Sequence, residues 1–418
     1  MTRFDRRPSG SRGKGRPTLL LALAISLMGC DTSSAEGSGA WQVEHENVDG
    51  IEVVRTVSGS VWDTPMELVE ELSIGVLDGD EVYMFGRIGA VAPDGRGGVY
   101  VFDGLVPALR HYDAEGRHVR TLGGEGEGPG EYGDAVLGMG LLSDGRLVLR
   151  DPRNGRFTFY APDGSPAGQW TLASGLFTNR ATYIDTTDHI YTRILTGPIE
   201  PDAPWPIGLL HLTPDGEILD TIPSPPFPGE PTGPGGALMP SKHWELHPHG
   251  YLVVGVSDRY ALELRRPEGT LRIEKEGERI QVHPEERAER EAQREYMIEQ
   301  QGQFMTSRPP PTPRIKPYFR NIYAGEDGTL WVHVHREASP RERRPEDDER
   351  APDGPPLSLW SEPSVFEVFE ADGTYLGEVH VPPQTTLYTY SLDELWAARR
   401  GEFDEVYLLR MRLEPRES

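Results

Sequence analysis

A four-strand unit that recurs six times is the feature that most restricts how this chain can fold. A complete copy reads as a short apolar strand, an Asp-Gly-like turn, a second strand, a polar loop, a third strand, another Asp-Gly-like turn and a fourth strand. The first copy, IGAVAPDGRGGVYVFDGLVPALRHYDAEGRHVRTLGG, spans residues 88–124. The copies that follow lie within residues 137–172, 181–222, 243–274, 320–381 and 386–414.

The chemistry of the turns explains this repeat. Asp-Gly supports the positive φ angles of a two-residue β-hairpin turn, and the flanking strands alternate apolar and polar residues, as in 99–102 and 146–149. Four antiparallel strands repeated six times favour an all-β, six-bladed β-propeller with four-stranded blades. The alternative is a β-sandwich or two small β domains.

Two segments resemble a known family of repeats. The strings DGRGGVYVFD and RHYDAEGRHVRTLG are similar to NHL-type repeats of six-bladed propellers, and residues 123–134 resemble a junction in bacterial six-bladed propeller lipoproteins. The resemblance covers about residues 85–400. It implies the fold, but propellers include binding scaffolds, lactonases and lyases alike, so it implies no single activity.

The last copy supplies only three clear strands, so the ring needs a strand from elsewhere. The alternating runs 51–57 or 68–75 can provide it, and joining first and last segments in one blade leaves no open sheet edge. We therefore expect residues 46–418 to form one propeller domain with loop insertions.

The first thirty residues read as an export signal. A basic segment, 1–18, precedes an apolar run, 19–28, that is too short for a stable membrane anchor, so residues 1–29 are predicted to be a signal peptide. Residues 30–45 then read as a flexible tether.

The end of this signal carries a second resemblance. Leu27, Met28, Gly29 and Cys30 resemble the lipobox of bacterial lipoproteins, which implies that Cys30 is lipidated and becomes the new N-terminus. The alternative is an ordinary signal peptide with an incidental cysteine. The lipoprotein interpretation places the protein in the cell envelope, held to a membrane through its N-terminal lipid.

Charge and cysteine content exclude several classes of function. The chain of 418 residues has 42 Lys and Arg against 67 Asp and Glu, a formal charge of −25, which becomes about −30 once the basic residues 1–29 are removed. Such a surface repels phosphate, so nucleic acid is not an expected partner. The single cysteine excludes a disulfide within the chain.

Long insertions gather at one end of the predicted blades. The loops between second and third strands, and the links between blades, leave from the same strand ends, which we call the link face; the Asp-Gly turns lie on the opposite turn face. Loops this long are often functional, so we expect the link face to be the binding surface. The insertions are residues 196–206, 223–241, 280–318 and 336–362.

One insertion contains a predicted helix. Residues 284–305 are rich in Glu, Arg, Gln and Ala, and Pro284 suits a first helical turn. Its few apolar residues lie near its end, so we expect it to contact the propeller through that end, as a lid or as a structural brace. These residues are Tyr296, Met297, Phe304 and Met305.

Polar residues at the ends of the second strands are the candidate ligand-binding residues at the channel mouth. Asp103, Asp151 and Asp258 either cap their own loops through Asx-type hydrogen bonds or form a ring of carboxylates. Calcium-assisted lactonases of similar fold use Asp, Asn and Glu there. The remaining candidates are Arg153, Asn154, Arg193, Arg259, Arg399 and Arg400, whose guanidinium groups can bind an anion or pair with these carboxylates.

Histidines give only weak metal candidates. His243 and His247 enter the fourth unit, and His333 and His335 share one face of a strand. Zinc needs three or four ligands, which neither pair supplies alone, so no cofactor is predicted beyond this weak possibility of zinc or calcium.

The sequence contains no assembled catalytic motif. We therefore expect an exported, membrane-anchored binding module for an envelope protein, a peptide or a small molecule, and not an enzyme. The alternative is a metal-assisted hydrolase, lactonase or lyase with a site at the channel mouth.

Overall fold

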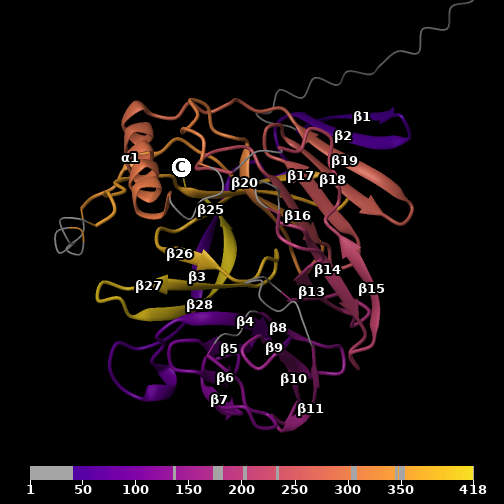
Figure 1. Ribbon diagram of the computed structural model, residues 1–418, viewed down its shortest axis with the longest axis vertical. Coiled ribbons are helices and arrows are strands. Elements are labelled where there is room, and N and C mark those ends of the chain that lie inside the picture. The colour runs from indigo at the N-terminus through magenta and orange to yellow at the C-terminus, as the bar shows by residue number, and fades with distance from the viewer. Residues whose placement is uncertain are drawn as a thin grey trace, which may run out of the picture. The chain divides into compact units, whose positions relative to one another are not determined.

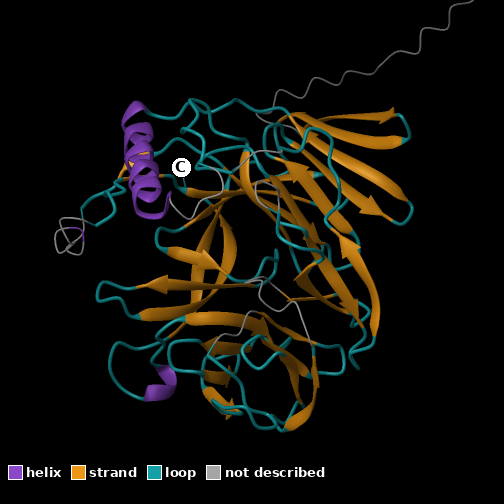
Figure 2. Ribbon diagram, viewed as in Figure 1, coloured by secondary structure: helices purple, strands orange, loops and turns teal. Residues whose placement is uncertain are grey.

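The computed structural model describes residues 41–134, 138–172, 182–200, 205–231, 235–302, 308–343, 347 and 354–417. The predicted signal peptide, the lipobox and Cys30 lie outside these residues. The described chain is mostly β-strand (Figure 2). None of its helices is long and apolar enough to span a membrane.

The first three predicted units each form a four-stranded antiparallel sheet in chain order (Figure 1). The first sheet contains β4 (Ile88–Pro93), β5 (Val99–Asp103), β6 (Ala108–Tyr112) and β7 (His118–Leu122). The second contains β8 (Gly138–Leu141), β9 (Leu147–Asp151), β10 (Arg156–Tyr160) and β11 (Pro166–Thr171). The third contains β12 (Thr182–Ile184), β13 (Ile190–Leu195), β14 (Ile207–Leu212) and β15 (Ile218–Pro223).

The remaining units follow the same order with additions from the N-terminal segment. The fourth sheet contains β16 (Lys242–Leu246), β17 (Leu252–Val256), β18 (Ala261–Arg266) and β19 (Gly269–Lys275). The fifth contains β20 (Phe319–Ala324), β21 (Leu330–Val334), β24 (Ser364–Phe369) and β25 (Tyr375–Val381), with a short pair, β22 (Ser339–Pro340) and β23 (Trp360–Ser361), in its long loop. The last contains β26 (Thr385–Leu387), β27 (Leu395–Arg400) and β28 (Val406–Pro415).

The N-terminal segment completes the last sheet. Strand β3 (Met66–Ile74) pairs antiparallel with β28, with Ile74 opposite Leu408, and also pairs in parallel with β25. Of the two runs that the sequence offered for this role, the second one therefore fills it.

The other run extends the fourth sheet instead. Strand β2 (Ile51–Ser58) pairs in parallel with β19 and antiparallel with β1 (Gln42–Val48). Burial of Val53 and Val54, each 1% exposed, favours this position. Residues 42–45, which the sequence assigned to the tether, instead lie in β1 because they pair with β2.

The core lies between neighbouring sheets, as in a β-propeller. All five residues of β5 are buried, which requires a packed layer on both faces of its sheet. Phe102 and Leu109 of the first sheet share one apolar cluster with Leu147 and Leu149 of the second. The innermost strands of neighbouring sheets contact each other, β4 with β8, β8 with β12 and β16 with β20, and β27 of the last sheet contacts β4 of the first.

The turn at residues 142–146 differs from the two-residue turn that the sequence predicted, whereas Arg266 and Gly269 of the fourth sheet do pair across a two-residue turn. Leu142 and Arg146 close a three-residue connection, in which the Gly145 N–H donates to the Leu142 carbonyl at 2.9 Å. Only Gly145, with φ of 84°, takes the left-handed conformation, whereas Asp144 accepts a hydrogen bond from the Arg146 N–H. This is a type I turn followed by a glycine bulge, a geometry that needs one positive φ angle and not two.

Candidate functional site

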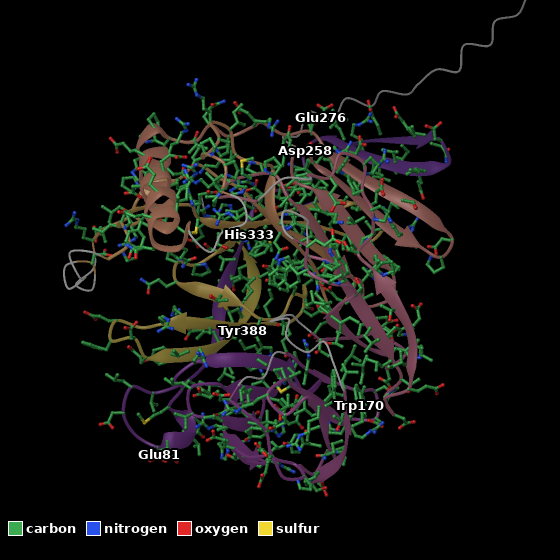
Figure 3. The ribbon with its side chains drawn as sticks, in the orientation of Figure 1. Glu81, Trp170, Asp258, Glu276, His333 and Tyr388 are labelled. Atoms are coloured by element: carbon green, nitrogen blue, oxygen red, sulfur yellow. The ribbon has the colours of Figure 1, made fainter. Side chains whose placement is uncertain are left out.

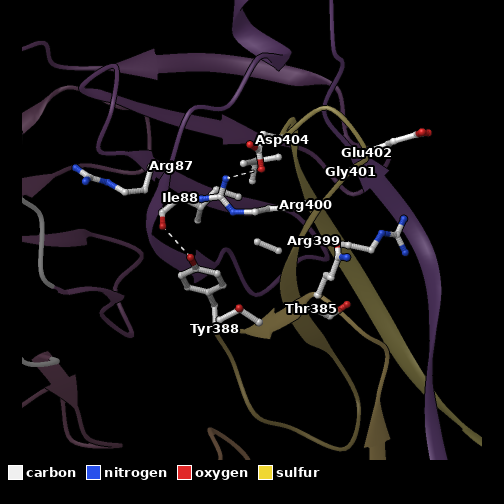
Figure 4. Close-up of a pocket in the computed structure, with 13 residues that line it drawn as sticks. Arg87, Ile88, Thr385, Tyr388, Arg399, Arg400, Gly401, Glu402 and Asp404 are labelled. Atoms are coloured by element: carbon white, nitrogen blue, oxygen red, sulfur yellow. Dashed lines mark hydrogen bonds and ion pairs between the residues drawn. The ribbon is translucent and has the colours of Figure 1, made fainter. Parts of the chain in front are cut away.

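A cleft of about 570 Å³ lies between the last sheet and the first, at the link-face ends of their strands (Figure 4). Its cationic side comes from Arg87 before β4 and from Arg399 and Arg400 at the end of β27. Ile88 and Tyr388 line its inner wall. The cleft therefore combines apolar surface with arginine residues from both sheets, and the Arg87 and Arg399 side chains point in opposite directions in Figure 4.

The three arginines differ in how tightly they are held. Arg399 forms a 2.8 Å ion pair with Glu70 of β3. Arg400 lies 3.5 Å from Asp404, and both side chains are largely exposed, at 57% and 87%. The Arg87 Nη2 group donates to the Gly104 carbonyl at 2.9 Å. Exposed ion pairs contribute about 0–1 kcal/mol, so the Arg400–Asp404 pair is easily exchanged.

A second cavity of about 520 Å³ lies between the fourth and fifth sheets. Its buried carboxylate is Glu367, which pairs with Lys275 at 3.2 Å and Arg336 at 3.1 Å. Arg336 also pairs with Glu378 at 2.6 Å. The two carboxylates and the two cations of this group therefore balance one another within the cavity.

Helix α1 (Pro284–Gln301) lies next to the second cavity and begins at Pro284, as the sequence predicted. Its Glu286 carboxylate and the Glu362 carboxylate both pair with the Lys316 ammonium, at 2.9 and 3.0 Å. All three side chains are at most 1% exposed. Such a buried triad holds a helix firmly, because separating its charges leaves them unpaired.

The sequence predicted that apolar residues near the end of the helix contact the propeller. The contacts found among the described residues are different. The Glu289 carboxylate accepts from the Leu359 and Trp360 N–H groups, and His283 stacks on Trp360 at 4.1 Å. The described contacts of the helix are thus polar, and they extend along it to Arg294, which donates to the Pro309 carbonyl at 2.8 Å. Phe304 and Met305 lie outside the described residues.

Two of the predicted channel-mouth carboxylates cap loops. The Asp103 carboxylate accepts backbone hydrogen bonds from Gly86, Arg87 and Leu105, at 2.7 to 3.0 Å. The Asp151 carboxylate accepts from the Asn154 amide at 2.7 Å. Both carboxylates are fully buried and are committed to these contacts.

The other candidates are distributed over several sheets. Asp258, which follows β17, is exposed (Figure 3). The buried hydroxyl of its neighbour Ser257 accepts a hydrogen bond from the Ser241 N–H group. Arg153 pairs with Asp134 at 2.9 Å, and Arg259 lies over the Phe227 ring. Arg193 is buried over the Trp244 ring at 4.3 Å. The structure therefore brings only Arg399 and Arg400 of the arginine set to one cleft.

The histidine candidates are hydrogen-bonded within the protein. His243 contacts the Ser241 hydroxyl at 2.7 Å and the Asn321 amide at 3.3 Å. The His247 Nε2–H donates to the Gly328 carbonyl at 3.0 Å, and burial lowers the pKa of His247 to about 4. Burial likewise lowers the pKa of His243 to about 4.

The second histidine pair is also committed to side-chain contacts. His333 contacts the Ser364 hydroxyl at 3.3 Å and stacks on Phe366, while His335 contacts the Glu362 carboxylate at 3.1 Å. Within the described ranges, no group of three or more His, Cys, Asp or Glu side chains is placed to hold a metal ion.

Arg87 and Tyr388 are the cleft residues that sequence reasoning missed. Arg87 precedes β4 and Tyr388 follows β26, the first strands of their sheets. Neither position belongs to a cluster of polar residues in the sequence. Closure of the ring of sheets could have identified them. Once the last unit is placed beside the first, residues at the start of β4 must face residues at the start of β26.

Comparisons with known proteins inform the fold only. No protein family model matches this chain, and no curated protein is similar to it in sequence. A member of the DUF4221 family from Bacteroides vulgatus matches with a TM-score of 0.50 and 12% identity, over 84% of this chain and 99% of that one.

Two further solved structures are more distant. An exported protein from Bacteroides fragilis matches with a TM-score of 0.49 and 11% identity, over 87% of this chain and 99% of that one. Virginiamycin B lyase from Staphylococcus aureus matches with a TM-score of 0.39 and 12% identity, over 84% and 100%. Similarities this weak assign no activity to the chain described above.

Proposed function

We propose that this protein is an exported, lipid-anchored β-propeller of six blades that acts as a binding module through its link face. Five consecutive four-strand units, and a sixth of three strands that β3 completes, support the blade number. Contact between β27 of the last unit and β4 of the first supports a closed ring. The lipobox-like residues that end at Cys30 support the anchor.

The observation that carries the binding role is the position of the cleft that contains Arg87, Arg399 and Arg400. It opens at the strand ends from which the long loops and links depart. The opposite strand ends are joined by tight turns such as 142–146. Ligands bind preferentially in concave sites, so the link face is the surface equipped for recognition.

Exposed apolar side chains in two turns of the link face support recognition of a partner protein or peptide. Phe403 is 69% exposed in the turn that also supplies Gly401 and Asp404 to the cleft lining. Leu105 and Val106 are 64% and 59% exposed in the turn whose Gly104 carbonyl binds Arg87. Aromatic and arginine side chains together are typical of interface hot spots.

The alternative of a metal-assisted hydrolase, lactonase or lyase has less support. The carboxylates Asp103 and Asp151 that were candidates for such a site accept hydrogen bonds from their own loops. Calcium or zinc therefore remains without an assembled set of ligands among the described residues.

The binding role is tested by chemical crosslinking in cell envelopes from the native host. We expect the wild-type protein to form a crosslinked species that is lost when Phe403, Leu105 and Val106 are all changed to Ala. A matched triple variant on the turn face, at Arg96, Glu115 and Arg117, should retain it. Loss in both variants, or in neither, would argue against the link face.

The anchor is tested separately. Cys30→Ser should move the protein from the membrane fraction to the soluble envelope fraction and abolish labelling by an alkyne fatty acid. Membrane association that survives this substitution would contradict lipidation at Cys30.

A further inference from the structure

We propose that Ser241 is a nucleophile for acyl transfer, with His243 as its general base, and that this site hydrolyses esters. The activity adds to the binding role of the link face and does not depend on it. Its basis is a series of hydrogen-bonded side chains that joins two sheets: Ser241 and His243 at the start of β16, and Asn321 in β20.

The geometry of the strand places Ser241 beside His243. Ser241 directly precedes β16 and continues its pairing, because the Ser257 N–H group donates to the Ser241 carbonyl at 3.0 Å. Side chains two residues apart in an extended strand point to the same face, so the hydroxyl and the imidazole lie together. The Ser241 Oγ is 2.7 Å from the His243 Nε2, the distance of a good hydrogen bond.

Asn321 fixes which nitrogen of His243 carries the proton. Strand β20 lies beside β16 (Figure 1), and the Asn321 Oδ1 is 3.3 Å from the His243 Nδ1. An amide oxygen only accepts hydrogen bonds, so Nδ1–H is the donor and Nε2 keeps its lone pair. The Ser241 hydroxyl therefore donates to Nε2, which is the arrangement that a serine nucleophile needs.

Burial determines how strong a base His243 is. Burial lowers the pKa of His243 to about 4, and a charge on its neighbour His335 lowers this pKa further. The imidazole is therefore neutral at pH 7 and free to accept a proton, but it accepts the proton weakly. A leaving group then departs with little help, so the site suits esters of phenols and other acidic alcohols and not amides.

Ser241 is exposed at the link-face end of β16, where a backbone donor lies next to it. Because the Ser241 carbonyl faces β17, the Lys242 N–H group points to the opposite edge of β16. The Trp244 carbonyl points to that edge as well and accepts from the Arg193 Nη2 at 2.7 Å. Among the described strands, none pairs with this edge. The Lys242 N–H group can therefore stabilise the negative oxygen that forms during attack on the ester.

The reaction balances with water as its only co-reactant. The Ser241 Oγ forms a bond to the ester carbonyl carbon while its proton moves to the His243 Nε2. The bond to the leaving oxygen then breaks, and that oxygen takes the proton from Nε2, which releases the phenol and leaves an acyl group on Ser241. Water attacks this acyl group by the same proton route, releases the carboxylic acid and restores the serine.

Labelling with a fluorophosphonate tests the nucleophile. The reagent forms an O–P bond to an activated serine and releases fluoride, so peptide mapping of the protein purified from cell envelopes should find the label on Ser241. Ser241→Ala should lose it. Ser364→Ala is the matched control, since the Ser364 hydroxyl also contacts a histidine, His333, but at 3.3 Å. An unlabelled wild type, or a label on other residues only, would overturn the proposal.

Hydrolysis of 4-nitrophenyl acetate tests the activity and its substrate class. We expect a burst of 4-nitrophenol followed by turnover, and a loss of kcat/KM of about 10²-fold or more in Ser241→Ala and in His243→Gln. The amide 4-nitroacetanilide should not be hydrolysed. Equal rates in the wild type and Ser241→Ala would overturn the proposal, and equal rates on the ester and the amide would overturn the assigned class.

Asn321 acts through His243 and is a positioning residue, which two variants test. Asn321→Leu removes the acceptor and should lower kcat by about 10²-fold with little change in KM. Asn321→Asp keeps an oxygen acceptor and should restore the rate, while its negative charge raises the pKa of His243 and moves the acid limb of the pH–rate profile to higher pH. Equal losses in the two variants, or an unmoved limb, would contradict this role of Asn321.

Discussion

The Tyr388 hydroxyl donates a 2.7 Å hydrogen bond to the carbonyl of Ile88, which lies 300 residues earlier in the chain. Tyr388 follows the innermost strand of the last sheet, and Ile88 begins the innermost strand of the first. The bond therefore joins the two ends of the repeat array and forms part of the cleft wall.

Tyr388→Phe tests the contribution of this contact. We expect it to lower the free energy of unfolding by about 1 kcal/mol, because the Ile88 carbonyl loses its partner while the ring packing remains. Urea denaturation measures the change. Tyr318→Phe, at a half-buried ring, is the comparison and should change stability by less; equal losses would show that the hydroxyl of Tyr388 has no special role.

Closure by β3 predicts a large effect of truncation. Removing residues 41–78 deletes the strand that pairs with β28, so the last sheet gains an open edge, and we expect the melting temperature to fall sharply. A finer test is Leu68→Ala, which removes a buried side chain of β3 and should cost about 2–5 kcal/mol. Exposed Val48→Ala should be close to neutral, and an unchanged melting curve in the truncated protein would refute the closure.

The buried triad under helix α1 predicts an asymmetric response to mutation. Lys316→Met leaves the Glu286 and Glu362 carboxylates buried without their shared cation and should cost about 3–5 kcal/mol. Adding Glu286→Gln to that variant removes a buried carboxylate whose remaining partner is Arg290, at 3.1 Å, and should restore part of the loss. A double variant that is less stable than Lys316→Met would contradict this account of the helix contact.

Buried histidine predicts a loss of stability in mild acid. Burial holds the pKa of His247 at about 4, below its ordinary value of about 6.5, so the unfolded chain binds the proton more tightly than the native protein does. The stability contributed by neutral His247 is therefore complete above pH 6.5 and is lost as the pH falls from 6.5 to 4. Unfolding titrations at pH 7 and 5 measure this slope.

A substitution assigns the slope to this residue. His247→Gln should reduce the pH dependence between pH 6.5 and 4, whatever its effect at pH 7, and leave the share that comes from the similarly buried His243 and His333. Exposed His45→Gln should leave the slope unchanged. A slope that is the same in the wild type and in His247→Gln would assign the acid sensitivity to other groups.

Much of the fold could be predicted from the sequence because its signals are local. Asp-Gly turns and alternating strands defined each unit to within one or two residues, for example 88–124 against β4 to β7. The turn type was wrong at residues 142–146, since a type I turn with a glycine bulge and a two-residue turn share the same Asp-Gly sequence. The choice between 51–57 and 68–75 for the closing strand depended on packing against β28, which local sequence does not encode.

The candidate site was less predictable for the same reason. Asp103 and Asp151 have the residue type of a ligand, and only the positions of the Gly86 and Asn154 donors show that their oxygens are occupied. Arg87 looks like an ordinary residue before a strand. Its place in the cleft lining depends on the neighbouring sheet, whose strands lie about 300 residues later in the sequence.

Site-specific photo-crosslinking in the native host tests the central claim most directly. A photoreactive amino acid is placed at Phe403 or Leu105 on the link face, and at Glu115 or Arg96 on the turn face, all exposed positions. We predict one discrete crosslinked partner or ligand from the link-face positions and none from the turn-face positions. A partner captured equally from both faces, or only from the turn face, would contradict a binding module that acts through its link face.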